Sequence, residues 1–133
     1  MGGGTNHRIG LYDAALVKDN HIEATGSIAE AVKAVRRNAP FMAKVEVEAG
    51  NMKQVQEAID AGADVIMLDN MNLAQMAEAV KLINQRAGVE ASGGITLESI
   101  RQVAETGVDF ISSGALTHSA PVVDFNMKIT MNV

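Results

Sequence analysis

The chain alternates between short apolar runs and longer stretches in which apolar residues recur every three or four positions. The short runs have the length of β-strands and cover residues 15–18, 44–48, 65–68, 89–91 and 110–112. The longer stretches predict amphipathic helices, with apolar stripes formed by Ile28, Ala31, Val32 and Val35, by Val55, Ala58 and Ile59, by Met76, Ala79, Val80 and Ile83, and by Ile100, Val103 and Ala104. Strands and helices are therefore predicted to alternate.

Signals for helix ends agree with this pattern. Ser27 precedes the first periodic stretch and is followed three residues later by Glu30, which is the spacing of a capping box. Thr96 is placed in the same way before the last stretch. Gly62 and Gly107 each stand between a helical stretch and the next strand, where glycine commonly ends a helix in a left-handed conformation. The chain is thus predicted to repeat a strand–helix unit.

The spacing of the repeat predicts parallel strands joined by helices. Polar residues end or follow the runs at Lys18, Glu46, Asp69, Ser92 and Ser113, at intervals of 28, 23, 23 and 21 residues. Such a span accommodates a strand, a helix and two loops, which gives either a doubly wound sheet or a (β/α) barrel. Polar residues after nearly every strand favour the barrel, because its active face collects residues from many strand ends, whereas a doubly wound sheet binds ligands mainly at one switch point.

We therefore predict an α/β fold, a parallel (β/α) barrel of TIM-like type that is incomplete, with about five units in one portion spanning residues 1–133. A complete barrel needs about 200 to 250 residues. The chain is accordingly expected to be truncated, or to be completed by another chain.

Composition narrows the chemistry. An apolar content of 47% is enough for one packed domain, and there are no cysteines to form disulfides or a thiolate site. A net charge of -5 and 3% aromatic residues argue against a nucleic-acid partner. No apolar run is long enough to span a membrane, and we expect a cytoplasmic protein. Chemistry must come from Lys, His, Arg, Asp, Glu and backbone amides.

Three basic side chains near the start are candidates for binding an anion. His7 and Arg8 follow a glycine-rich segment, and Lys18 ends the first strand beside Asp19 and His21. Arg offers a planar fork that matches a carboxylate, and Lys offers a point charge. The glycine-rich start taken alone is equally consistent with an unstructured terminus. A charged residue after a strand, such as Lys18, is also consistent with a solvated loop.

The second and third strands carry acidic candidates. Alternation in the second strand places Lys44, Glu46 and Glu48 on one face, which would point into a barrel, where buried charges need a partner, ligand or metal. An edge strand with one wet face would show the same pattern. Asp69 follows the apolar third strand and is a candidate Mg²⁺ or cation-stabilising ligand, while helix capping there is assigned to Asn70 or Asn72.

Two glycine-containing turns are candidates for holding a phosphate. Each follows one of the last two strands, where a barrel commonly builds its phosphate site together with a short helix, predicted here over 116–119. A pair of plain turns is the alternative. The residues concerned are Ser92, Gly93, Gly94, Ser113 and Gly114.

Several ordered motifs together resemble the quinolinate phosphoribosyltransferases, also called carboxylating nicotinate-nucleotide pyrophosphorylases. The resemblance runs from Gly2 to about Met127. It rests on Gly-Gly-Gly-Thr-Asn-His-Arg-Ile-Gly-Leu-Tyr-Asp from residue 2, Val-Lys-Asp-Asn-His-Ile from residue 17, Lys-Val-Glu-Val-Glu from residue 44, Met-Leu-Asp-Asn-Met from residue 67, Glu-Ala-Ser-Gly-Gly-Ile from residue 90 and Gly-Val-Asp-Phe-Ile-Ser-Ser-Gly-Ala-Leu-Thr-His-Ser from residue 107.

The resemblance implies transfer of phosphoribose from phosphoribosyl pyrophosphate to quinolinate with loss of CO₂, yielding nicotinate mononucleotide for NAD biosynthesis, with Mg²⁺ as cofactor. It implies that Lys18, Glu46 and Asp69 are catalytic, with Glu46 and Asp69 meeting the ribose or the metal. It implies that the quinolinate carboxylates are bound by His7, Arg8 and Lys18, and that Lys44 also binds substrate. The implied ligands of the ribosyl phosphate are Ser92, Gly93, Gly94, Ser113 and Gly114. The motif favours Glu46 over Glu48, a choice that the alternation alone leaves open.

The resemblance also implies an amino-terminal sandwich domain and a first barrel strand ahead of the glycine motif, and a homodimer or larger homo-oligomer in which neighbouring subunits share an active site. The chain alone is therefore expected to be nearly inactive. Two alternatives are a related pyrophosphorylase-like barrel linked to molybdenum transport and a non-catalytic half-barrel that self-assembles. In the latter, the alternating segment 125–133 could form an extra strand at an edge.

Overall fold

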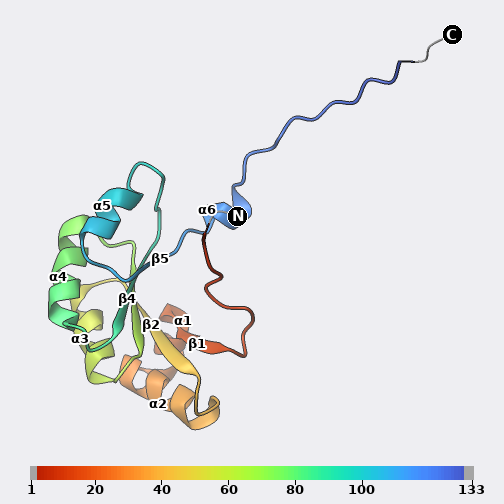
Figure 1. Ribbon diagram of the computed structural model, residues 1–133. Helices are drawn as coiled ribbons and strands as arrows, with labels where there is room; N and C mark the ends of the chain where they lie inside the picture. Colours follow the sequence, from red (N-terminus) through yellow and green to blue (C-terminus); the bar gives the residue numbers. More distant parts are fainter. Residues whose placement is uncertain (1–2, 131–133) are drawn as a thin grey trace.

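The computed structural model describes residues 3–130. Within this range, five strands alternate with helices in a regular order (Figure 1). No helix in the described range is long and apolar enough to cross a membrane. The elements are β1 Ala14–Val17, α1 Asp19–Thr25, α2 Ile28–Asn38, β2 Lys44–Ala49, α3 Met52–Asp60, β3 Val65–Asp69, α4 Leu73–Ile83, β4 Gly88–Ser92, α5 Ile100–Glu105, β5 Phe110–Ile111 and α6 Ala115–His118.

All five strands are parallel and pair in their chain order, from β1 to β5. Helices α2 to α5 pack side by side along one face of this sheet, each against at least one of the strands next to it in sequence (Figure 1). A doubly wound sheet would reverse its strand order and place helices on both faces. The sequential order with one helical layer therefore confirms the predicted barrel-like α/β fold in partial form.

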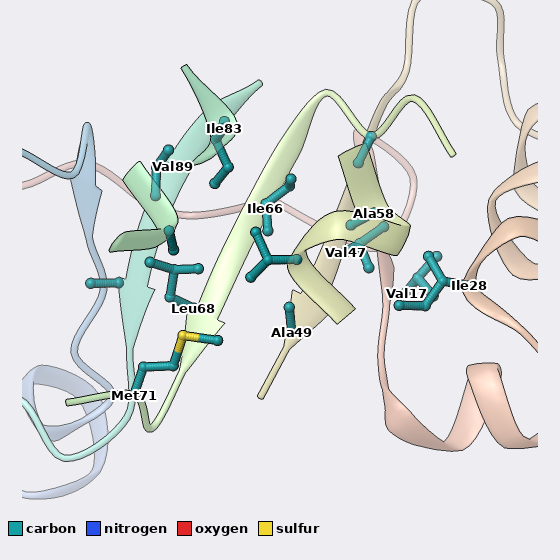
Figure 2. Packing of buried hydrophobic residues seen from close by; sticks show 14 of the residues in the cluster. Val17, Ile28, Val47, Ala49, Ala58, Ile66, Leu68, Met71, Ile83 and Val89 are labelled. Carbon is teal, nitrogen blue, oxygen red and sulfur yellow. The ribbon is translucent and has the colours of Figure 1, made fainter. Parts of the chain in front are cut away.

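The core lies between the sheet and this helical layer. Alternate residues of the central strands, such as Val47, Ile66 and Leu68, are completely buried against helix residues that include Ala58 and Ile83 (Figure 2). Burying an aliphatic side chain of this size contributes about 1.5–3 kcal/mol. Since side chains alternate across a strand, the intervening residues face the opposite side of the sheet, which α2 to α5 do not cover.

Three predicted helix ends are confirmed and one is wrong. Ser27 Oγ accepts a hydrogen bond from Glu30 N at 3.2 Å, and Gly62 and Gly107 adopt φ of 73° and 92°. The helix expected to begin after Thr96 begins at Ile100 instead. Ser99 Oγ accepts from Thr96 N at 3.0 Å, so its hydroxyl stabilises the preceding turn.

Two further segments differ from the sequence-based prediction. Helix α1 follows directly on β1 and buries no residue, so it leaves no apolar stripe to recognise. At the other end, residues 125–130 form no strand, and Phe125, Met127 and Ile129 are exposed. This segment extends away from the sheet (Figure 1), and the remainder of the predicted strand lies outside the described residues. Alternation alone did not form a strand here, because no edge lies beside it to complete the backbone hydrogen bonds.

Candidate active site

Most of the predicted chemistry gathers at the carboxyl ends of the strands. Asp69 and Ser92 are direct neighbours in the β3–β4 ladder. Lys18 follows the last residue of β1, and its Nζ lies 3.7 Å from Glu48 Oε2 near the end of β2. The Lys18 side chain is half exposed, so this pair contributes little stability. Its ammonium group is instead available to an anionic ligand.

Asp69 is fixed by its neighbour Asn70. Asn70 Nδ2 donates to Asp69 Oδ2 at 2.9 Å, and Asn70 N donates to the Ser92 carbonyl at 3.0 Å. Helix capping falls to Asn72, whose Oδ1 accepts from Gln75 N at 3.0 Å. Asn72 therefore caps the helix, as predicted, whereas Asn70 braces Asp69 at the carboxyl end of β3, a contact that was not predicted.

The loop after β4 needs glycine. Gly93 has φ of 93°, and a Cβ there would clash with the side chain of Asn70, so no side chain fits. Gly94 follows with φ of 61°. The Ser92–Gly93–Gly94 turn, predicted to hold a phosphate, is thus a tight turn at the end of β4 in which Gly93 leaves no room for a side chain.

The second predicted phosphate loop lies beside the first. Ser113 Oγ donates to the Ile95 carbonyl at 3.4 Å, which joins the loop after β5 to the loop after β4. Gly114 precedes α6, which spans Ala115–His118 and so begins one residue before the predicted 116–119. The two turns thus adjoin one another, as the barrel prediction expected.

The basic candidates His7, Arg8 and Lys44 do not lie together at the carboxyl ends of the strands. His7 Nε2 contacts Glu46 and Glu90, and Arg8 Nη1 donates to the Ala14 carbonyl at 3.3 Å. Lys44 begins β2, four residues before Glu48 and therefore about 13 Å away along the strand. Lys44 therefore lies at the amino-terminal ends of the strands, opposite to Lys18 and Asp69 at the carboxyl ends.

Glu46 occupies a deeper position than the other acidic candidates. Its Oε2 lies 2.9 Å from His7 Nε2, and the same nitrogen lies 3.3 Å from Glu90 Oε2. Glu46 is 7% exposed and Glu90 is 4% exposed. The sequence analysis missed Glu90, although the signal was present: a lone carboxylate stands between Val89 and Ala91 in a strand that is otherwise apolar or small.

Burial raises the pKa of Glu46 to about 7, with a further increase from the nearby Glu90 charge and an opposing decrease from His7. Within residues 3–130, Glu46 Oε1 and Glu90 Oε1 are buried and form no hydrogen bond. Buried carboxylate oxygens without a partner are costly. Among the described residues, the open face of the sheet therefore holds two buried carboxyl oxygens without a hydrogen-bond partner.

Comparison with known proteins agrees with the fold and the motifs. A sequence model described as the C-terminal domain of quinolinate phosphoribosyl transferase matches residues 1–128. A probable carboxylating nicotinate-nucleotide pyrophosphorylase from Synechocystis is 50% identical, covering 99% of this chain and 46% of that protein. A decarboxylating quinolinate phosphoribosyltransferase from Nicotiana tabacum is 42% identical over 97% of this chain and 42% of its own length.

Solved structures give the same result. NadC from Streptococcus pyogenes matches with a TM-score of 0.87 and 48% identity, covering 96% of this chain and 45% of that one. A thiamine phosphate pyrophosphorylase from Pyrococcus furiosus, at 20% identity and a TM-score of 0.62, shares only the fold. The chain spans about half the length of the relatives it matches. It belongs to the quinolinate phosphoribosyltransferase family, and the matched region is the C-terminal domain of that family.

Proposed function

We propose that this chain supplies the catalytic face of a quinolinate phosphoribosyltransferase, which transfers phosphoribose from phosphoribosyl pyrophosphate to quinolinate and releases pyrophosphate and CO₂. The observation that carries the proposal is the register of β3 with β4, which sets Asp69 beside Ser92 and the glycine loop. A carboxylate and a phosphate-binding turn then meet at one strand edge, as a sugar phosphate requires. The related proteins' names favour this reading over the molybdenum-linked barrel and the non-catalytic half-barrel.

The bond changes define what the site must do. The quinolinate nitrogen forms a bond to the ribose anomeric carbon while the bond to pyrophosphate breaks, so positive charge builds on the sugar. Carboxylates held at fixed positions stabilise such charge. The neighbouring ring carboxyl group then leaves as CO₂, and the ring carbon that keeps the electron pair takes up a proton. Lys18 is suited to hold a substrate carboxylate as a point charge.

Geometry favours Glu48 over Glu46 as the partner of Asp69. Glu46 pairs with Val65 in the ladder, four residues before Asp69, which corresponds to about 13 Å along the strand. Glu48 pairs with Met67, only two residues before Asp69, or about 7 Å. Glu46 is also engaged by His7. We therefore assign the sugar-facing role to Glu48 and Asp69, in place of the Glu46 expected from the motif.

The proposed Mg²⁺ fits this pair, since both offer the carboxylate oxygens that the ion prefers. When bound together with phosphoribosyl pyrophosphate, the ion would neutralise pyrophosphate charge and so ease its departure. Asp69 would hold the ion, with Glu48 nearby, while Asn70 keeps the Asp69 carboxylate oriented through its 2.9 Å hydrogen bond.

The edge strands β1 and β5 pair with no further strand among the described residues. We accordingly propose that the working enzyme is a homo-oligomer completed by the remaining parts of the family's fold.

Calorimetry with phosphoribosyl pyrophosphate and Mg²⁺, and separately with quinolinate, tests the proposal. Asp69→Asn is expected to weaken phosphoribosyl pyrophosphate binding at least 10-fold, and Lys18→Ala to weaken quinolinate binding. Glu78→Gln, on the exposed face of α4, is the matched control and should change neither. Binding that survives both active-site changes, or that is absent from a chain shown to be folded by circular dichroism, would contradict a substrate site on this face.

A further inference from the structure

Lys18 occupies a position where another type of residue is expected. It follows β1 directly and is also the N-cap of α1, so no loop separates this strand from this helix. The N-caps of α2, α3 and α4 are Ser27, Asn51 and Asn72, and each accepts a hydrogen bond from a backbone amide of the first turn. Serine and asparagine are preferred there because their side-chain oxygens accept such a bond. A lysine ammonium group only donates, so Lys18 cannot cap α1 in this way.

His21 forms the side-chain bond at this junction. Its Nδ1 accepts from Lys18 N at 2.9 Å, and its own backbone N donates to the Lys18 carbonyl at 2.9 Å. Both backbone groups of Lys18 are therefore bonded to one residue. Because Nδ1 accepts from an amide, it carries no proton, and the neutral ring keeps its proton on Nε2. These contacts lie within four successive residues, so they need no other element of the fold.

The junction determines the point from which the Lys18 side chain starts. On one side of it, Val17 pairs with Val47 in the sheet. On the other side, Ile22 of α1 packs against the core. The bond between His21 and Lys18 closes the turn between these two anchors. From this fixed start, Lys18 Nζ reaches to 3.7 Å from Glu48 Oε2. Placing the start of a long side chain limits the positions that its ammonium group can occupy.

We propose that His21 is a positioning residue for Lys18, which caps α1 from the third helical position and so allows a cation to occupy the N-cap. The inference rests on the proposed function, in which Lys18 holds a carboxylate of quinolinate. Helix α4 shows the same bond with a different residue, since Gln75 Oε1 accepts from Asn72 N at 3.0 Å. There Asn72 also caps the helix itself. At α1 the side-chain capping depends on His21 alone.

Variants of His21 separate the capping bond from the imidazole itself. His21→Ala removes the acceptor and should weaken quinolinate binding about 3- to 10-fold, the range expected when one positioning hydrogen bond is lost. His21→Gln should restore the affinity, because glutamine at the third helical position accepts the same bond, as Gln75 does in α4. Glu23→Ala, at an exposed position of the same helix, is the matched control and should change nothing. Calorimetry measures the affinities, and circular dichroism verifies that each variant folds.

A second comparison shows whether His21 acts through Lys18. When Lys18 is already replaced by alanine, His21→Ala should cause no further loss of quinolinate affinity, because the side chain that His21 positions is absent. A general loosening of the fold would instead weaken binding in both backgrounds. Equal losses in the two backgrounds, or a His21→Gln variant as weak as His21→Ala, would therefore overturn the positioning role.

Hydrogen exchange at the Lys18 amide, followed by NMR, detects the bond without any ligand. Exchange should be slow in the unmodified chain and in His21→Gln, and at least about 5-fold faster in His21→Ala, because the amide then opens more readily to solvent. Rapid exchange in the unmodified chain would overturn this inference and leave the proposed function untouched. Slow exchange together with no quinolinate binding by any folded version would overturn the proposed function, and with it the role of His21.

Discussion

The two faces of the sheet are built from the same strands but perform different tasks. In β2, Val45 and Val47 are completely buried against helices, while Glu46 and Glu48 point to the opposite face. The outer face, which the helices cover, therefore provides stability, and the inner face, which is the open face of the sheet, provides chemistry. A single residue of register decides which task a side chain performs, because a shift by one position would exchange the two faces.

The largest expected effect is on the outer face. Leu68→Ala removes a fully buried side chain, and we expect a loss of about 2–5 kcal/mol in the free energy of unfolding from the cavity left behind. Urea denaturation followed by circular dichroism measures it. Glu48→Gln, on the inner face of the neighbouring strand, is the control and should cost less than about 1 kcal/mol. Equal losses in the two variants would show that the faces do not divide their tasks.

The next effect concerns pH and the inner face. The pKa of Glu46 is about 7 in the folded chain, against an ordinary value of 4.5. As pH rises, the unfolded chain therefore loses this proton first, and the free energy of unfolding should fall between pH 4.5 and about 8, by roughly 3 kcal/mol at most.

Urea denaturation at several pH values, with EDTA present to remove metals, measures this dependence. Glu46→Gln should flatten the decline and make the chain more stable than the unmodified protein at pH 8. Glu48→Gln should retain the decline. A stability that rises with pH over this interval would contradict the burial of an unbalanced carboxylate at Glu46.

A smaller effect is expected where helices return to the sheet. Asp64 Oδ2 accepts from Val45 N at 2.7 Å, and Asp109 Oδ2 accepts from Val89 N at 2.8 Å. In both repeats, an aspartate just before a strand thus bonds to the backbone of the preceding strand. Arg36 also donates to Asp64, at 2.7 Å. Asp64→Asn should lower the free energy of unfolding by about 1–2 kcal/mol. Asp109→Asn should cost less, because Asp109 has no comparable ion pair among the described residues; a larger loss there would contradict this ranking.

Sequence alone predicted the repeat well, and the reason is physical. Period-two and period-3.6 patterns depend on local geometry, so the strands, α2 to α5 and the glycine ends at Gly62 and Gly107 followed from neighbouring residues. Contacts across the sheet do not have this property. Glu90 and Glu46 are 44 positions apart in the sequence, and only the order and curvature of the strands bring them to the same imidazole.

The same limit explains what the motifs could not decide. They placed Asp69 and the glycine turns correctly at the strand ends, but ranked Glu46 above Glu48, which the ladder register reverses in our proposal. They also grouped Lys44 with Lys18, although the two lie at opposite ends of their strands. The distance between residues on different strands depends on the register of those strands, which is known only once the partner strand is known.

The smallest effect tests the far end of the chain against the core. Phe125 is 88% exposed, whereas Leu68 is completely buried, although both are large apolar residues. Phe125→Ser should therefore change the free energy of unfolding by less than about 0.5 kcal/mol, as surface substitutions usually do. Sedimentation velocity on the same variant adds a second reading. A loss above 1 kcal/mol, or a change from oligomer to monomer, would mean that the extended segment packs on another copy of the chain and that its alternating pattern serves that contact.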